Sequence, residues 1–113
     1  MRSAFLSRKT ARERAFKMLF AMDIGDNTIE EALEIAVRPE NKSDQIPFIL
    51  SEVKGVLENL PDIDELINYH SNDWTINRMA STDRNILRLA VYEILHRPDI
   101  PISVSINEAV EIA

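Results

Sequence analysis

The fold class can be read from one run, Ser81-Thr82-Asp83-Arg84-Asn85-Ile86-Leu87-Arg88-Leu89-Ala90-Val91-Tyr92-Glu93-Ile94-Leu95-His96. Its apolar residues recur every three to four positions, which is typical of one face of an α-helix and not of a half-buried strand. Either Ser81 or Thr82 can cap this helix, and Asp83 lies favourably near the positive end of the helix dipole. The width of the apolar face predicts a central buried helix that packs through Ile86, Leu87, Ala90, Val91, Ile94 and Leu95.

The same helical period recurs along the rest of the chain, so we predict an all-α protein. Prolines set several of the expected helix ends, because a proline disfavours the helical region for the residue before it. Thr28 with Glu31, and Ser105 with Glu108, have the spacing of capping boxes. The expected helical segments are 7–24, 28–38, 46–60, 63–67, 74–79, 82–96 and 103–113.

Length and composition predict one globular domain. The 113 residues are 45% hydrophobic and 28% charged, which is ordinary for a folded protein. The chain has no cysteine, which excludes disulfides and thiolate metal sites. No run of sequence approaches the roughly 20 apolar residues of a membrane-spanning helix. We therefore expect a cytoplasmic protein with no membrane partner.

Charge is distributed unevenly along the chain. The net charge is −6, yet residues 1–17 contain six basic residues and one acidic residue. That segment carries roughly +5, which leaves about −11 for the remainder. A basic end on an acidic body suits a protein that binds RNA with one face and a basic partner with another. The alternative is a basic, solvated helix end without a ligand.

Four residues near the N-terminus form the candidate RNA site. Arg8, Arg12, Phe16 and Phe20 are spaced by four, so they form one column along a helix. Guanidinium groups bind phosphates and aromatic rings stack on unpaired bases, so this column is suited to single-stranded RNA. The alternative for the two phenylalanines is a place in the core, which we favour for Phe16.

Catalysis is not indicated by the sequence. His70 and His96 lie apart and lack the spacing of metal ligands. Gly25 and Gly55 are the only glycines, so there is no glycine-rich phosphate loop. No nucleophile, base and orienting group can be named together. We predict that the chain is not an enzyme and needs no cofactor and no metal.

Longer motifs indicate a family. Residues 74–79 read W-x-I-x-R-M, residues 83–93 read D-R-x-I-L-R-L-A-x-Y-E, and residues 106–111 read I-N-E-A-V-E. Residues 11–15 read A-R-E-x-A, with Leu19 and Phe20 following. Together these motifs resemble the NusB family of bacterial transcription antitermination factors, in register over nearly the whole chain. The resemblance implies a helical bundle of two small subdomains, here about 1–60 and 61–113 within a single domain 1–113.

The resemblance also implies a function and a set of contacts. NusB-like proteins pair with the ribosomal protein NusE, bind boxA-type single-stranded elements of ribosomal RNA transcripts, and act on the transcribing RNA polymerase complex. Phe20 stands where the family often has a tyrosine, and Asp83-Arg84 stands where the family meets RNA and NusE. Arg78 and Arg88 match the family pattern too, but pairing with Glu93 or Glu108 explains them equally well. The expected RNA-binding residues are Arg8, Lys9, Arg12, Phe20 and Arg84, and the expected partner-binding residues are Phe20 and Asp83.

The chain departs from the family at its end. NusB-like sequences continue past the I-N-E-A-V-E helix, whereas this sequence stops at Ala113, so we expect the family's C-terminal helices to be missing. The apolar face of the 83–96 helix would then be partly uncovered, which favours a homodimer or a domain-swapped oligomer. Three alternatives stay open: a fragment of a ribosomal RNA cytosine methyltransferase, a helical protein-interaction module without RNA binding, and a remnant without function.

Overall fold

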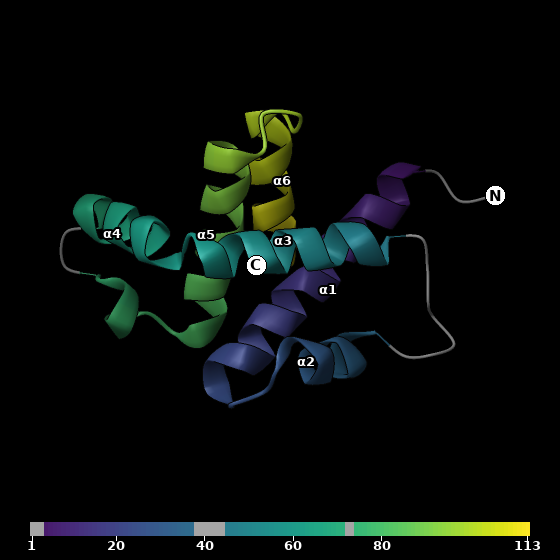
Figure 1. The fold of residues 1–113 in the computed structure, drawn as a ribbon. Helices are drawn as coiled ribbons and strands as arrows, with labels where there is room; N and C mark the ends of the chain where they lie inside the picture. The colour runs from purple at the N-terminus through teal and green to yellow at the C-terminus, as the bar shows by residue number, and fades with distance from the viewer. Residues whose placement is uncertain (1–3, 38–44, 72–73) are drawn as a thin grey trace. The chain divides into compact units, whose positions relative to one another are not determined.

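The computed structural model describes residues 4–37, 45–71 and 74–113, with side chains from residue 8 onward in those ranges. Within these ranges the chain is helical and contains no β-strand, so the predicted all-α class is confirmed (Figure 1). The elements are α1 (Ala4–Ile24), α2 (Ile29–Ala36), α3 (Ile46–Glu58), α4 (Leu60–His70), the 3₁₀ helix η2 (Ile76–Arg78), α5 (Ser81–His96) and α6 (Ile102–Ile112).

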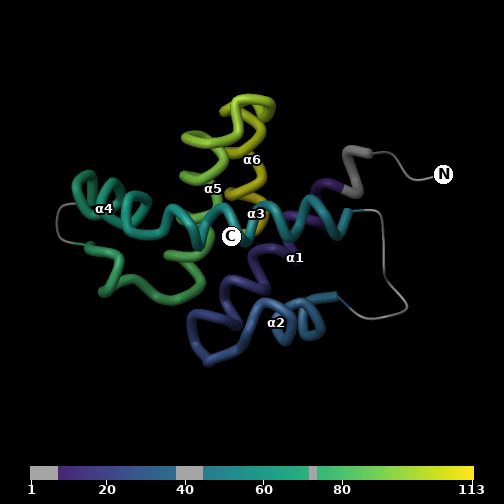
Figure 2. Tube along the Cα trace, viewed as in Figure 1, coloured from purple at the N-terminus to yellow at the C-terminus, as the bar shows by residue number. Residues whose placement is uncertain are grey.

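The chain divides into two compact units, Met1–Val53 and Lys54–Ala113. The division falls inside α3, earlier in the chain than the predicted subdomain boundary near residue 60. In the first unit α1 packs against α2, and in the second unit α5 packs against both α4 and α6. Figure 2 shows α5 and α6 running side by side in opposite directions, joined by a short connection.

The first unit is held by a well-capped α2. The capping box predicted at its start is present: the Glu31 backbone N–H donates to Thr28 Oγ1 at 3.1 Å, and the Thr28 N–H donates to Glu31 Oε1 at 2.8 Å. At the other end of α2, Arg14 Nη1 of α1 donates to the Ala36 carbonyl at 2.8 Å. Small residues are buried on both helices, which lets the two backbones approach closely. These residues are Ala11, Ala15, Ala32 and Ala36.

The second unit corrects the prediction for α5. Its buried stripe consists of Asn85, Ile86, Leu89, Tyr92 and Glu93. Leu87, Ile94 and Leu95, which we expected in the core, are 39%, 36% and 48% exposed. The prediction chose the most apolar face of the helix, whereas the structure buries a neighbouring face whose polar members find hydrogen-bond partners.

Two predicted caps are wrong. The N-cap of α5 is Ala80, with no side-chain hydrogen bond, and Ser81 instead accepts hydrogen bonds from Asn85. The N-cap of α6 is Pro101, so Ser105 and Glu108 lie inside the helix and do not form a capping box. Pro101 fixes its own φ near the helical value, which starts the helix earlier than a serine cap would. Asp83 does lie in the first turn of α5, as predicted.

No helix in the described ranges is both long enough and apolar enough to cross a membrane.

Candidate nucleic-acid interface

The basic end of α1 presents an arginine stacked on an aromatic ring. Arg8 is exposed, and its Cζ lies 3.8 Å from the centroid of the Phe48 ring of α3. Phe48 itself is only 8% exposed, so the packing of the first unit fixes its ring. A guanidinium that rests over a fixed ring loses little freedom when a base or phosphate binds it. Arg8 is therefore the best-presented basic residue of the predicted set.

Arg12 lies one turn further along α1, and its place differs from the prediction. It is 6% exposed, and its Cζ is 5.5 Å from the same Phe48 ring. A buried guanidinium offers little surface to a phosphate, so Arg12 is less accessible than Arg8. Lys9, beside Arg8, is half-buried.

Phe48 was missed by the sequence reasoning. It lies in a different helix from the arginines, and no residue of the expected helix 46–60 was predicted to contribute to the RNA site. No local pattern connects residues 8 and 48, because only the packing of α3 in the first unit brings the ring under the guanidinium. The only sequence feature that could have drawn attention to Phe48 is its place beside Pro47, near the start of the expected helix.

Phe16 and Phe20 form a pair on α1, as the spacing of four predicts. Their ring centroids are 6.2 Å apart and the rings are tilted by 37°. Both side chains are half-buried, so each has an edge accessible to solvent and neither lies fully in the core. Phe16 is thus less buried than we expected, and Phe20 remains accessible for a contact.

The second predicted contact region is the first turn of α5. Asp83 is exposed and Arg84 is half-buried. A helix N-terminus carries a partial positive charge, which stabilises Asp83 there and also attracts anions. The first turn of α5 belongs to the second unit, whereas the basic end of α1 belongs to the first.

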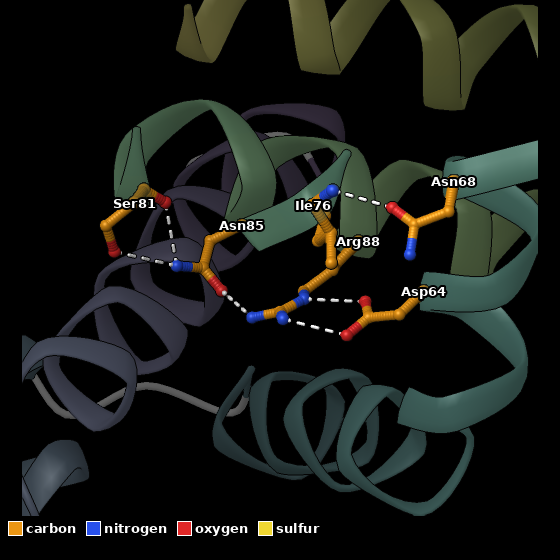
Figure 3. A network of polar contacts seen from close by, with 6 residues as sticks. All are labelled: Asp64, Asn68, Ile76, Ser81, Asn85 and Arg88. Atoms are coloured by element: carbon orange, nitrogen blue, oxygen red, sulfur yellow. Dashed lines mark hydrogen bonds and ion pairs between the residues drawn. The ribbon is translucent and has the colours of Figure 1, made fainter. Parts of the chain in front are cut away.

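A polar network fixes the start of α5 (Figure 3). Arg88 donates from Nε and Nη2 to the two carboxylate oxygens of Asp64 on α4, each at 2.9 Å. Arg88 Nη1 also reaches Asn85 Oδ1 at 3.4 Å, and Asn85 Nδ2 donates to the Ser81 carbonyl at 2.8 Å. Arg88 therefore forms a bidentate ion pair with Asp64, a partner that the sequence did not indicate. Since bidentate pairs are geometrically specific, this network holds the turn carrying Asp83 and Arg84 against α4.

The segment that leads into α5, which contains η2, is held in place by α4. Asn68 Oδ1 of α4 accepts a hydrogen bond from the Ile76 backbone N–H at 2.6 Å (Figure 3). Ile76 is buried, whereas Trp74 is 66% exposed. Arg78, at the end of η2, is exposed.

Two carboxylates are buried between α5 and α6. Ser105 Oγ donates to Glu93 Oε1 at 2.8 Å, and Glu93 and Ser105 are 1% and 2% exposed. Glu108 is 6% exposed on the same face of α6 as Ser105. Glu108 lies inside α6 and not at the helix start.

The described residues contain no group of three or more histidine, cysteine, aspartate or glutamate side chains that could hold a metal ion. His70 and His96 make ring contacts with Tyr69 and Tyr92, at centroid distances of 4.9 and 5.7 Å.

Comparisons with known proteins agree on one family. The NusB family model matches residues 9–113. The transcription antitermination protein NusB of Bacillus subtilis is 46% identical over 108 residues, which cover 96% of this chain and 80% of that protein. The corresponding protein of Pelotomaculum thermopropionicum is 50% identical over 109 residues, which cover 95% of this chain and 75% of that protein.

Solved structures give the same result. A structure of T. maritima NusB superimposes with a TM-score of 0.85 at 38% identity, covering all of this chain and 78% of that one. A structure of antitermination factors NusB and NusE in complex with double-stranded RNA superimposes with a TM-score of 0.82 at 25% identity, covering 93% of this chain and 79% of that one.

Proposed function

The chain belongs to the NusB family, and from this premise we propose that it is an RNA-binding transcription antitermination factor that acts with a NusE partner. The observation that carries the proposal is the match of residues 9–113 to the family, together with a structural relative solved with NusE and double-stranded RNA. The RNA is a boxA-type single-stranded element of ribosomal RNA transcripts. The role places the protein in the cytoplasm, with the transcribing RNA polymerase complex.

In this proposal Arg8 is the principal RNA contact. One face of its guanidinium lies on Phe48 and its exposed side is open to RNA. An unpaired base can stack on the open face, or a phosphate can accept hydrogen bonds from its edge. Lys9 adds positive charge beside it, and the buried Arg12, whose Cζ is 5.5 Å from the Phe48 ring, adds positive charge beneath the surface. The affinity is therefore electrostatic in large part and falls as salt concentration rises.

The first turn of α5 supplies the second set of contacts. Arg84 binds RNA and Asp83 binds NusE. In the first unit, the half-buried Phe20 of α1 separately contributes a contact to NusE or RNA. Residues 54–113 contain ten acidic and five basic residues, a balance of roughly −5 that favours docking of a basic ribosomal protein. The network from Asp64 through Arg88 to Asn85 keeps the first turn of α5 in place for both contacts.

Transcription readthrough tests this function. A terminator placed downstream of a boxA-type element is transcribed in vitro with the other antitermination components, with and without this chain. Readthrough should rise when the chain is added, and a template with a scrambled element should not respond. Equal readthrough on both templates would reject antitermination and favour a helical interaction module.

We also propose that the chain self-associates through an apolar face of the second unit. Neighbouring α5 and α6 both expose large apolar side chains there, which is unusual for a monomer surface. Burial of such a face against a second copy removes apolar area from water. The face consists of Leu87, Ile94 and Leu95 on α5 and Ile102, Ile106 and Val110 on α6.

Light scattering at several protein concentrations tests self-association. Ile106→Lys should shift the population toward monomer. Ile35→Lys is the matched control, because Ile35 is 60% exposed on α2 and lies outside the proposed face. A monomer at all concentrations, or an equal effect of the two variants, would contradict the proposal.

A further inference from the structure

One face of α4 combines an exposed aromatic ring with two carboxylates around a hollow. Asp62, Glu65, Leu66 and Tyr69 line a surface hollow of about 320 Å³. Their spacing of three, four and seven places them on one side of the helix. Tyr69 is 81% exposed and Leu66 is 37% exposed, so the apolar part of this face is open to solvent.

The side chains on this face do not hold the second unit together. α4 is anchored on another side, where Ile63 and Ile67 are buried and Asp64 binds Arg88. Neither Asp62 nor Glu65 forms an ion pair among the interactions of the described residues. Their negative charge is therefore available to a ligand, and α4 contains three acidic residues and no lysine or arginine to neutralise them.

We propose that this α4 face docks an arginine-bearing segment of a basic partner protein. The guanidinium would lie on the Tyr69 ring, where the cation–π attraction operates, and its N–H groups would reach the Asp62 and Glu65 carboxylates. The arginine stem would cover Leu66, because long cationic side chains bury their methylene groups against apolar surface. Arginine suits this site better than lysine, since its planar group can stack and bind a carboxylate at the same time.

The neighbouring ring supports this arrangement. His70 contacts Tyr69 with ring centroids 4.9 Å apart and an interplanar angle of 79°. This contact restrains an otherwise exposed ring before a ligand arrives, which lowers the entropy lost on binding. The two carboxylates disfavour RNA at the same surface, because phosphate groups would be repelled. The α4 face is thus a protein-docking surface, and the proposal does not depend on RNA binding by α1.

Fluorescence anisotropy of labelled peptides tests the proposal on the full chain without RNA. The probes are a fluorescein-labelled hexa-arginine peptide and a hexa-lysine peptide of equal charge. Tyr69→Ala should weaken hexa-arginine binding about two- to fivefold, which is the range of an exposed cation–π contact. Tyr69→Phe should retain binding, and Asp62→Asn/Glu65→Gln should weaken binding of both peptides.

The matched control is Glu30→Gln/Glu34→Gln. It removes the same charge from exposed positions of α2 in the other unit, and we expect little change in binding. Equal weakening by the two charge-removal variants would show non-specific attraction to an acidic protein and would overturn the proposal. Equal affinity for the arginine and lysine peptides, or an unchanged affinity in Tyr69→Ala, would overturn it as well.

Discussion

Replacing Gly55 by alanine should destabilise the second unit, although alanine is the better helix former. Gly55 is buried inside α3, and a Cβ added there would overlap Cζ, Oη and Cε1 of the Tyr92 ring. Tyr92 is 7% exposed, and its ring stacks on His96 at a centroid distance of 5.7 Å. The ring is therefore enclosed and can make room only if α3 or α5 shifts.

The magnitude follows from two opposing effects. Overpacking of a filled core costs about 1–3 kcal/mol, whereas glycine to alanine inside a helix gains about 1 kcal/mol. Because the overlap is with ring atoms of a buried side chain, we place the packing cost at the upper end. The free energy of unfolding should fall by about 1–2 kcal/mol, which corresponds to a melting temperature about 4–8 °C lower.

Thermal and urea unfolding followed by circular dichroism measure this change. Lys54→Ala, at the neighbouring exposed position of α3, is the control and should change stability by less than about 0.5 kcal/mol. Adding Tyr92→Leu to Gly55→Ala should give a loss smaller than the sum of the single losses, because leucine removes the overlapping ring atoms. A higher melting temperature for Gly55→Ala would refute the reasoning, since helix propensity alone would then account for the result.

Three further substitutions test contacts in the two units by the same unfolding assays. Arg88→Ala should lower the unfolding free energy by about 1.5–3 kcal/mol, because the half-buried Asp64 carboxylate loses both of its hydrogen bonds; a change below the error would show that the pair is only a surface contact. Thr28→Ala should cost about 0.5–2 kcal/mol through loss of the capping box, with Thr28→Ser retaining stability. Ser105→Ala should cost about 1–3 kcal/mol, because the buried Glu93 loses a donor; a neutral result would mean that another group replaces the hydroxyl.

Helix positions could be predicted from the sequence wherever a local signal sets the helix end. Thr28 and Glu31 define the start of α2 without reference to the rest of the chain, and the structure confirms that capping box. Pro101 and Ser105 show the limit of this reasoning. Both can start a helix, and the choice depends on Ser105 being needed inside α6 as a donor to Glu93, which only the packing of α5 on α6 determines.

Two features could not be predicted from the sequence: which face of α5 is buried, and which ring lies beneath Arg8. Hydrophobic periodicity assigns the most apolar face to the core, but Asn85 and Glu93 are buried because their partners Ser81 and Ser105 satisfy them. Similarly, Arg8 could be predicted as a basic surface residue, whereas its contact with Phe48 joins positions far apart in the sequence. The Glu93–Ser105 and Arg8–Phe48 contacts join residues on different helices, so periodicity and spacing within one helix cannot find them.

RNA binding by the α1 site is the most direct test of the account. The affinity for a boxA-type single-stranded RNA would be measured with and without NusE, at several salt concentrations, for the chain and for Arg8→Ala. Lys17→Ala is the matched control, because it removes one positive charge from an exposed position about 180° around the same helix. We predict that NusE strengthens binding, that salt weakens it, and that Arg8→Ala weakens it and lowers the salt slope by about 0.7 while Lys17→Ala does not. RNA affinity that ignores NusE, or that falls equally in both variants, would contradict the account.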